Sequence, residues 1–150
     1  MGLDKSSDSE IASNENTRVM VIGDDQVSAR ELVLVLEDAG IKTTMARSIN
    51  LKKLGGHLPS VVVVEEKAGK SGWEVSSQIR QESDIPIIML GNSNQEIAWA
   101  KAAAYGIDCY MVKPFSSREL VARIRTLVRR YDGTIQGFVG PEGQGMPAPV

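Results

Sequence analysis

The sequence has a single cysteine, at position 109, few aromatic residues and no long apolar run. One cysteine excludes a disulfide framework within the chain, and it is typical of the reducing cytoplasm, where we expect this protein to act. No stretch approaches the roughly 18 apolar residues of a membrane-spanning helix, so we expect no membrane-bound form. The formal net charge of −2 does not indicate a surface that binds polyanions.

Length and composition predict one domain with two less structured ends. Residues 1–16 are rich in Ser, Asp and Glu, lack the apolar core of a signal peptide and are interpreted as a disordered leader. Residues 132–150 contain several glycines without a regular period and are interpreted as a flexible tail or the start of a linker. The remaining segment, 17–131, is long enough to bury a hydrophobic core.

Short apolar segments alternate with amphipathic ones along this domain. Four consecutive valines at 61–64 have no polar face and end in two carboxylates, Glu65 and Glu66, which predicts a central strand that is covered on both sides. Further strands are predicted at 18–22, 41–45, 85–90 and 109–112. Helical spacing is found at 27–39, at 48–54 (at most a short helix), at 72–81, at 95–105 and from 116 onward.

This alternation predicts right-handed βαβ units and a flavodoxin-like (βα)5 fold, an α/β sandwich of three layers around a parallel five-stranded sheet. The simplest strand order is 2-1-3-4-5, and ligands of such sheets bind at the carboxyl ends of strands 1 and 3. Asp24, Asp25 and Glu65 should therefore converge there as an acidic pocket. The alternative for Asp24 and Asp25 is stabilisation of a helix N-terminus.

Two motifs are the most specific ones in the sequence. Residues 110–125 read Tyr-Met-Val-Lys-Pro-Phe-Ser-Ser-Arg-Glu-Leu-Val-Ala-Arg-Ile-Arg, and residues 83–90 read Ser-Asp-Ile-Pro-Ile-Ile-Met-Leu. With them, the chain resembles the receiver domain of two-component response regulators, CheY-like proteins that take part in phosphorelay signal transduction. Both motifs are most similar to the OmpR/PhoB-type subfamily of winged-helix transcription factors. The resemblance implies a histidine kinase or another signalling protein as partner, no enzymatic activity, and contact with DNA only through an output domain outside this chain.

The resemblance also assigns roles by position. In a typical member two acids after strand 1 hold Mg²⁺, an aspartate at the end of strand 3 accepts phosphate, and a Thr or Ser and a Lys-Pro pair grip the phosphoryl group. The proline often follows a cis peptide bond. The corresponding positions here are Gly23 and Asp24 (with Asp25 beside it), Glu65, Gly91, and Lys113 with Pro114.

Several of these positions have lost the expected chemistry. Glutamate places its carboxylate roughly 1.3–1.5 Å further from the backbone than aspartate does. Gly91 has no hydroxyl group, and the loop after Glu65 is shorter than usual. We expect no required cofactor, with Mg²⁺ at Asp24 and Glu65 as the alternative. We also expect Lys113 to pair with Glu65, because a buried carboxylate needs a partner.

We therefore interpret the chain as a pseudo-receiver, a dimerisation and regulatory module that works without phosphorylation. The alternative is a receiver that accepts phosphate on a carboxylate of the degenerate acidic pocket. A third possibility is a flavodoxin-like enzyme that uses Asp24, Glu65 and Lys113. Against it, the sequence lacks a phosphate-binding loop of the Gly-x-x-x-x-Gly-Lys kind.

A homodimer is predicted through the helix at 95–105, the strand at 109–112 and the last helix, because the subfamily dimerises on that face. Trp99 stands there among alanines where charge is expected; its alternative role is packing within its own domain. Tyr110 matches the aromatic switch of the family, with a fixed, half-buried tyrosine as the alternative. The residues assigned to the face are Trp99, Glu119, Arg123 and Arg125.

Overall fold

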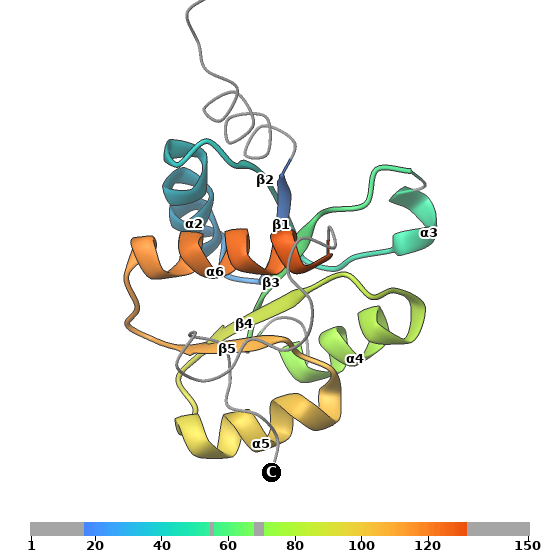
Figure 1. Ribbon diagram of the computed structural model, residues 1–150, viewed down its shortest axis with the longest axis vertical. Coiled ribbons are helices and arrows are strands. Elements are labelled where there is room, and N and C mark those ends of the chain that lie inside the picture. The colour runs from blue at the N-terminus through green and yellow to red at the C-terminus, as the bar shows by residue number, and fades with distance from the viewer. Residues whose placement is uncertain (1–16, 55, 68–70, 132–150) are drawn as a thin grey trace, which may run out of the picture.

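The sheet has the predicted architecture. The computed structural model describes residues 17–54, 56–67 and 71–131, so the expected leader and tail lie outside the described residues. The parallel strands have the order β2-β1-β3-β4-β5, which confirms the flavodoxin-like fold class (Figure 1). They span Arg18–Ile22 (β1), Lys42–Ala46 (β2), Val61–Glu65 (β3), Ile87–Gly91 (β4) and Cys109–Val112 (β5).

Helices cover both faces of this sheet. Helices α2 and α6 pack on one face, whereas α4 and α5 cover the other together with the single turn of α3 (Figure 1). None of the helices in the described part of the chain is long and apolar enough to cross a membrane. The helices span Gln26–Asp38 (α2), Leu51–Leu54 (α3), Gly72–Glu82 (α4), Gln95–Tyr105 (α5) and Ser117–Tyr131 (α6).

Strand β3 divides its side chains between two cores. Val61 and Val63 pack with residues of α2 and α6, while Val62 and Val64 pack with residues of α4 and α5. All four are fully buried, as the unbroken run of valines predicts for a central strand. Because strand side chains alternate between faces, the next two residues also separate: Glu65 lies on the α2–α6 side and Glu66 on the α4–α5 side.

Arg80 of α4 anchors the segment that leads into the start of β5. Its guanidinium donates to the carbonyl oxygens of Gly106 and Ser83 and pairs with Asp108 at 3.0 Å. Burial raises the pKa of Asp108, although the Ile87 amide and the charge of Arg80 act against that rise. These contacts join α4 to the starts of β4 and β5.

Candidate functional site

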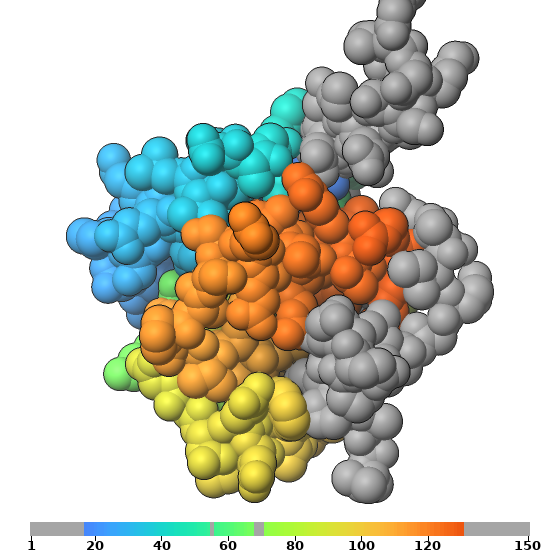
Figure 2. All heavy atoms as spheres, turned by 60° about the vertical axis from the view of Figure 1, so that its left-hand side comes forward, coloured from blue at the N-terminus to red at the C-terminus, as the bar shows by residue number. Residues whose placement is uncertain are grey.

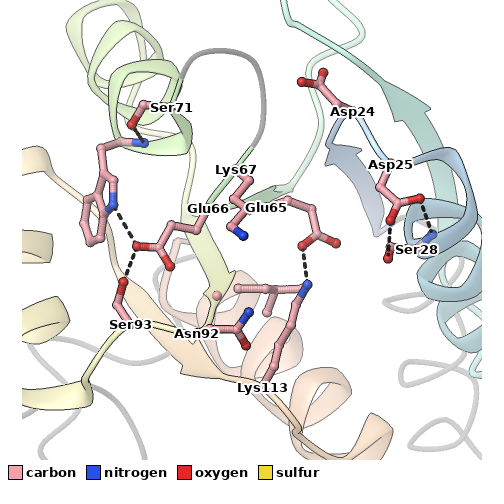
Figure 3. Close-up of a pocket in the computed structure, with 13 residues that line it drawn as sticks. Asp24, Asp25, Ser28, Glu65, Glu66, Lys67, Ser71, Asn92, Ser93 and Lys113 are labelled. Atoms are coloured by element: carbon pink, nitrogen blue, oxygen red, sulfur yellow. Dashed lines mark hydrogen bonds and ion pairs between the residues drawn. The ribbon is translucent and has the colours of Figure 1, made fainter.

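A pocket of about 610 Å³, lined mainly by polar and charged residues, opens at the carboxyl ends of β1, β3, β4 and β5 (Figure 3). It lies where the sequence analysis placed the acidic pocket, and its wall also includes Lys113 and the start of α4. Its lining comprises Asp24, Asp25, Ser28, Glu65, Glu66, Lys67, Ser71, Trp73, Leu90, Gly91, Asn92, Ser93 and Lys113.

Glu65 and Lys113 form the predicted ion pair. Lys113 Nζ donates to Glu65 Oε1 at 2.7 Å (Figure 3). The Glu65 side chain is 10% exposed and that of Lys113 is 34% exposed, so the carboxylate is buried and the ammonium group is partly open to solvent. The bond between Lys113 and Pro114 is cis, which agrees with the pattern expected from the family resemblance.

Gly23 gives Glu65 the room that its side chain occupies. A Cβ atom at Gly23 would lie 2.8 Å from Cγ of Glu65, closer than real Cβ contacts allow. Oε2 of Glu65 is buried and has no hydrogen-bond donor within the described residues. Glu65 is therefore fixed on one side by Lys113 and on the other by contact with the backbone end of β1.

The two aspartates after β1 turn away from Glu65. Asp25 caps α2: its carboxylate accepts hydrogen bonds from the amides of Val27 and Ser28 and from the Ser28 hydroxyl. The bond from the Ser28 amide leads the contacts that lower the pKa of Asp25. Asp24 directs its carboxylate away from both Glu65 and Asp25 (Figure 3). The helix-capping alternative thus describes Asp25.

The two carboxylates suggested as Mg²⁺ ligands do not converge in this structure. Magnesium is held in near-octahedral geometry by one or two carboxylates together with several waters. In the described part of the chain, no group of three or more His, Cys, Asp or Glu side chains lies close enough together to hold a metal ion. Of the two suggested ligands, Glu65 is paired with Lys113 and Asp24 points elsewhere, so the pocket offers no set of convergent oxygens.

Glu66, to which the sequence analysis gave no role, accepts three side-chain hydrogen bonds in the pocket. Its Oε1 accepts a hydrogen bond from the Tyr110 hydroxyl at 2.6 Å. Its Oε2 accepts from Trp73 Nε1 at 3.1 Å and from the Ser93 hydroxyl at 2.5 Å. Burial alone would raise the pKa of Glu66, but the hydrogen bonds from Ser93, Tyr110 and Trp73 outweigh it and lower the pKa below its ordinary value.

Tyr110 is buried, with its hydroxyl in the space beside Gly91. The residue is only 3% exposed, and its hydroxyl also accepts a hydrogen bond from the Ser93 amide at 2.9 Å. Burial, followed by the hydrogen bond to Glu66, raises the pKa of Tyr110. Tyr110 therefore has a buried orientation in this structure, and the space left by Gly91 is shared between Tyr110 and Glu66.

Helices α5 and α6 cover opposite faces of the sheet and flank the edge strand β5, and their surfaces adjoin along that edge (Figure 2). Trp99 is half-buried against the core beneath α5, so it contributes to packing within its own domain. Arg123 pairs with Glu119 at 3.1 Å and also contacts the Cys109 sulfur. Arg125 instead donates to the Ala39 carbonyl at the end of α2, which places it on the opposite flank of α6.

A family model described as the response regulator receiver domain matches residues 19–125. The chain belongs to the response regulator receiver domain family. Solved structures agree: it superposes with a TM-score of 0.68 and 27% identity on a putative response regulator from Chloroflexus aurantiacus, covering 76% of this chain and 98% of that one. For the receiver domain of the Francisella response regulator 1452 the TM-score is 0.70 and the identity 28%, covering 77% and 99%.

Curated relatives of this receiver domain include regulators of transcription and signalling. The chain is 32% identical over 119 residues to the sensory transduction protein RegX3 of Mycobacterium tuberculosis, covering 76% of this chain and 52% of RegX3. It is 34% identical over 123 residues to the probable transcriptional regulator ycf27 of Pyropia yezoensis, covering 79% and 50%. The chain thus spans about half the length of these relatives.

Removing the lysine of the ion pair should destabilise this receiver domain. Lys113→Ala leaves Glu65 buried and unpaired, and we expect a loss of about 1–2 kcal/mol in the free energy of unfolding, because water partly reaches the lysine end. Lys53→Ala, which truncates an exposed lysine of α3, is the matched control and should change little. Equal effects of the two variants in urea denaturation would show that the ion pair is unimportant.

The contact between Gly23 and Glu65 predicts a strong coupling between these two positions. Gly23→Ala should cost about 1–3 kcal/mol by overpacking against the Glu65 side chain. In a Glu65→Ala background the clashing Cγ atom is absent, so the same substitution should cost much less. Denaturation of the wild type, both single variants and the double variant gives the coupling energy. Additive effects would mean that Glu65 does not fill the space beside Gly23.

Proposed function

We propose that this receiver domain is a pseudo-receiver, a dimerisation and regulatory module of two-component signalling that works without phosphoryl transfer. The proposal rests on the residue at the phosphate-acceptor position. Glu65 stands where the family has its aspartate, and it is paired with Lys113. In family members that lysine grips the phosphoryl group. Here its charge is already neutralised by a carboxylate within the protein.

The chemistry of phosphoryl transfer supports the same proposal. Transfer requires an acceptor oxygen, a metal and stabilising groups in a precise arrangement, and a displacement of about 1 Å can cost on the order of a hundredfold in rate. The acceptor is a longer acid, the acids beside it do not converge, and Gly91 supplies no hydroxyl group. Each departure alone would impair transfer, and together they remove the acceptor geometry, the metal site and one phosphoryl contact.

The wider role follows from the relatives. Because the chain covers about half of RegX3 and ycf27, we propose that it serves as the regulatory part of a cytoplasmic transcription factor with no enzymatic activity of its own. DNA would be contacted only by an output domain outside this chain. A histidine kinase or another signalling protein would act on the receiver surface through binding.

The proposed dimer uses the α5–β5–α6 face. Ile97 on α5 is 65% exposed, and Ala100 and Ala104 are exposed on the same side of that helix. Exposed apolar side chains grouped on one face favour a protein partner. Since Arg123 is already paired with Glu119 in the same chain, association through this face would depend little on charges across the interface.

A small-molecule phosphodonor tests the absence of phosphoryl transfer. We expect no stoichiometric phosphorylation after incubation with acetyl phosphate and Mg²⁺, because the acceptor position lacks the required geometry. Intact mass spectrometry measures the product, and a receiver domain with an aspartate acceptor serves as the positive control. A species heavier by one phosphoryl group, mapped to Glu65 or Asp24, would instead support the alternative of a phosphate-accepting receiver.

Sedimentation velocity tests the dimer. We expect the unphosphorylated wild type to dimerise, and Ile97→Glu to shift it to monomer by placing a charge in the apolar interface. Trp99→Glu should act in the same direction, but Trp99 also packs on its own core, so Ile97→Glu is the decisive variant. Leu34→Glu, on the exposed side of α2, is the matched control and should remain dimeric.

Raising the salt concentration should weaken the dimer only slightly, since the contact is mainly apolar. A wild type that stays monomeric at high micromolar concentration would contradict the proposed interface. So would an Ile97→Glu variant that dimerises as well as the control.

A further inference from the structure

The Glu66 carboxylate joins three separate parts of the fold at the end of β3. Its hydrogen-bond donors are Tyr110 on β5, Trp73 in the first turn of α4, and Ser93 in the segment between β4 and α5. Figure 3 shows the Glu66 side chain directed towards Ser93 and away from Lys113. Both carboxylate oxygens are used, and hydrogen bonds to a charged acceptor are stronger than those between neutral groups.

Both the hydroxyl group and the ring of Tyr110 make contacts that hold the side chain in place. Its hydroxyl donates to Glu66 and accepts from the Ser93 amide. Its ring stacks on that of Trp73, with centroids 5.9 Å apart and an interplanar angle of 8°. Trp73 is itself fixed by an edge contact with Tyr105 and by the Lys101 ammonium group, which lies 4.7 Å from the centroid of its ring. Turning Tyr110 outward would break both hydrogen bonds and the ring stacking.

Gly91 makes this arrangement possible. A Cβ atom at that position would overlap Oε1 of Glu66 and lie 2.5 Å from the Tyr110 hydroxyl oxygen. In typical family members a Thr or Ser occupies this position and contacts the phosphoryl group. With a side chain at position 91, Glu66 and Tyr110 would have to shift from the positions that they have in this structure.

We propose that Glu66 is a positioning residue that holds Tyr110 in the buried orientation without any phosphoryl signal. Through Ser93, it also connects the segment before α5 to β3 and β5. We call this set of contacts around Glu66 the latch. The inference deepens the proposed function and rests on it for its role in signalling, because a latched Tyr110 fixes the surface around β5 in one state. Ser93 directly precedes Asn94, which caps α5, so the same hydrogen bonds also fix the start of that helix.

The exposure of the Tyr110 ring in solution tests the latch directly. Proton relaxation of labelled tyrosine rings is measured with a soluble paramagnetic agent, and Tyr110→Phe assigns the signal among the three tyrosines of the chain. We expect Tyr110 to be protected in the wild type. In Glu66→Ala we expect a several-fold increase in its relaxation enhancement, because the hydroxyl loses its carboxylate partner and the ring can turn outward.

Two further variants keep the experiment decisive. Glu66→Gln retains the shape and one acceptor oxygen, so it should give a smaller increase and provides the result if Glu66→Ala fails to fold. Glu37→Gln neutralises an exposed glutamate of α2 and should leave Tyr110 protected. A Tyr110 ring that is exposed in the wild type, or equally protected in folded Glu66→Ala or Glu66→Gln, would overturn the latch.

The outcome is separable from that of the proposed function. Phosphorylation or a monomeric state of the wild type would refute the proposed function while the protection of Tyr110 still reports on the latch. Conversely, a Tyr110 that does not respond to Glu66 substitutions refutes the latch alone, whatever the state of association.

Discussion

The end of β3 has to accommodate two adjacent carboxylates in a sheet that is covered on both sides. Strand alternation sends Glu65 to the α2–α6 side and Glu66 to the α4–α5 side, so the two charges do not compete for the same space. Each side chain has room because a neighbouring strand ends in a glycine. Gly23, after β1, leaves room for Glu65, and Gly91, at the end of β4, leaves room for Glu66. The geometry of the pocket depends on these two pairs.

The two carboxylates are stabilised by different means. Glu65 has a full positive charge beside it, whereas Glu66 has three neutral donors. Glu65 is buried and Glu66 is half-buried, so the loss of these partners would leave each carboxylate poorly satisfied. Lys113 and the donors around Tyr110 therefore stabilise the fold as well as shape the pocket. Glu65 is thus paired with Lys113, and Glu66 is hydrogen-bonded to Tyr110, so these groups contact each other instead of a ligand.

Periodicity predicted the fold well, because the valine run and the apolar helix faces report directly on burial. The ion pair between Glu65 and Lys113 was also predicted, since both residues stand at strand ends beside one crevice. The role of Glu66 was missed. Alternation from Val62 and Val64 places it on the face of Tyr110, but no sequence pattern shows that Gly91 leaves room for its carboxylate. The flank of α6 on which Arg125 lies, against the end of α2, likewise depends on how the helix is rotated in the folded chain.

We propose above that Glu65 and Lys113 pair with each other in place of a phosphoryl group in this receiver domain. A titration followed by the backbone amide signals in NMR tests this most directly, with Mg²⁺ added first and a beryllium fluoride analogue of the phosphoryl group second. The account predicts no saturable shifts for residues at the pocket, including Asp24, Glu65, Gly91 and Lys113. Saturable shifts at those amides that spread to β5 and α5 would show a working phosphoryl switch and contradict the account.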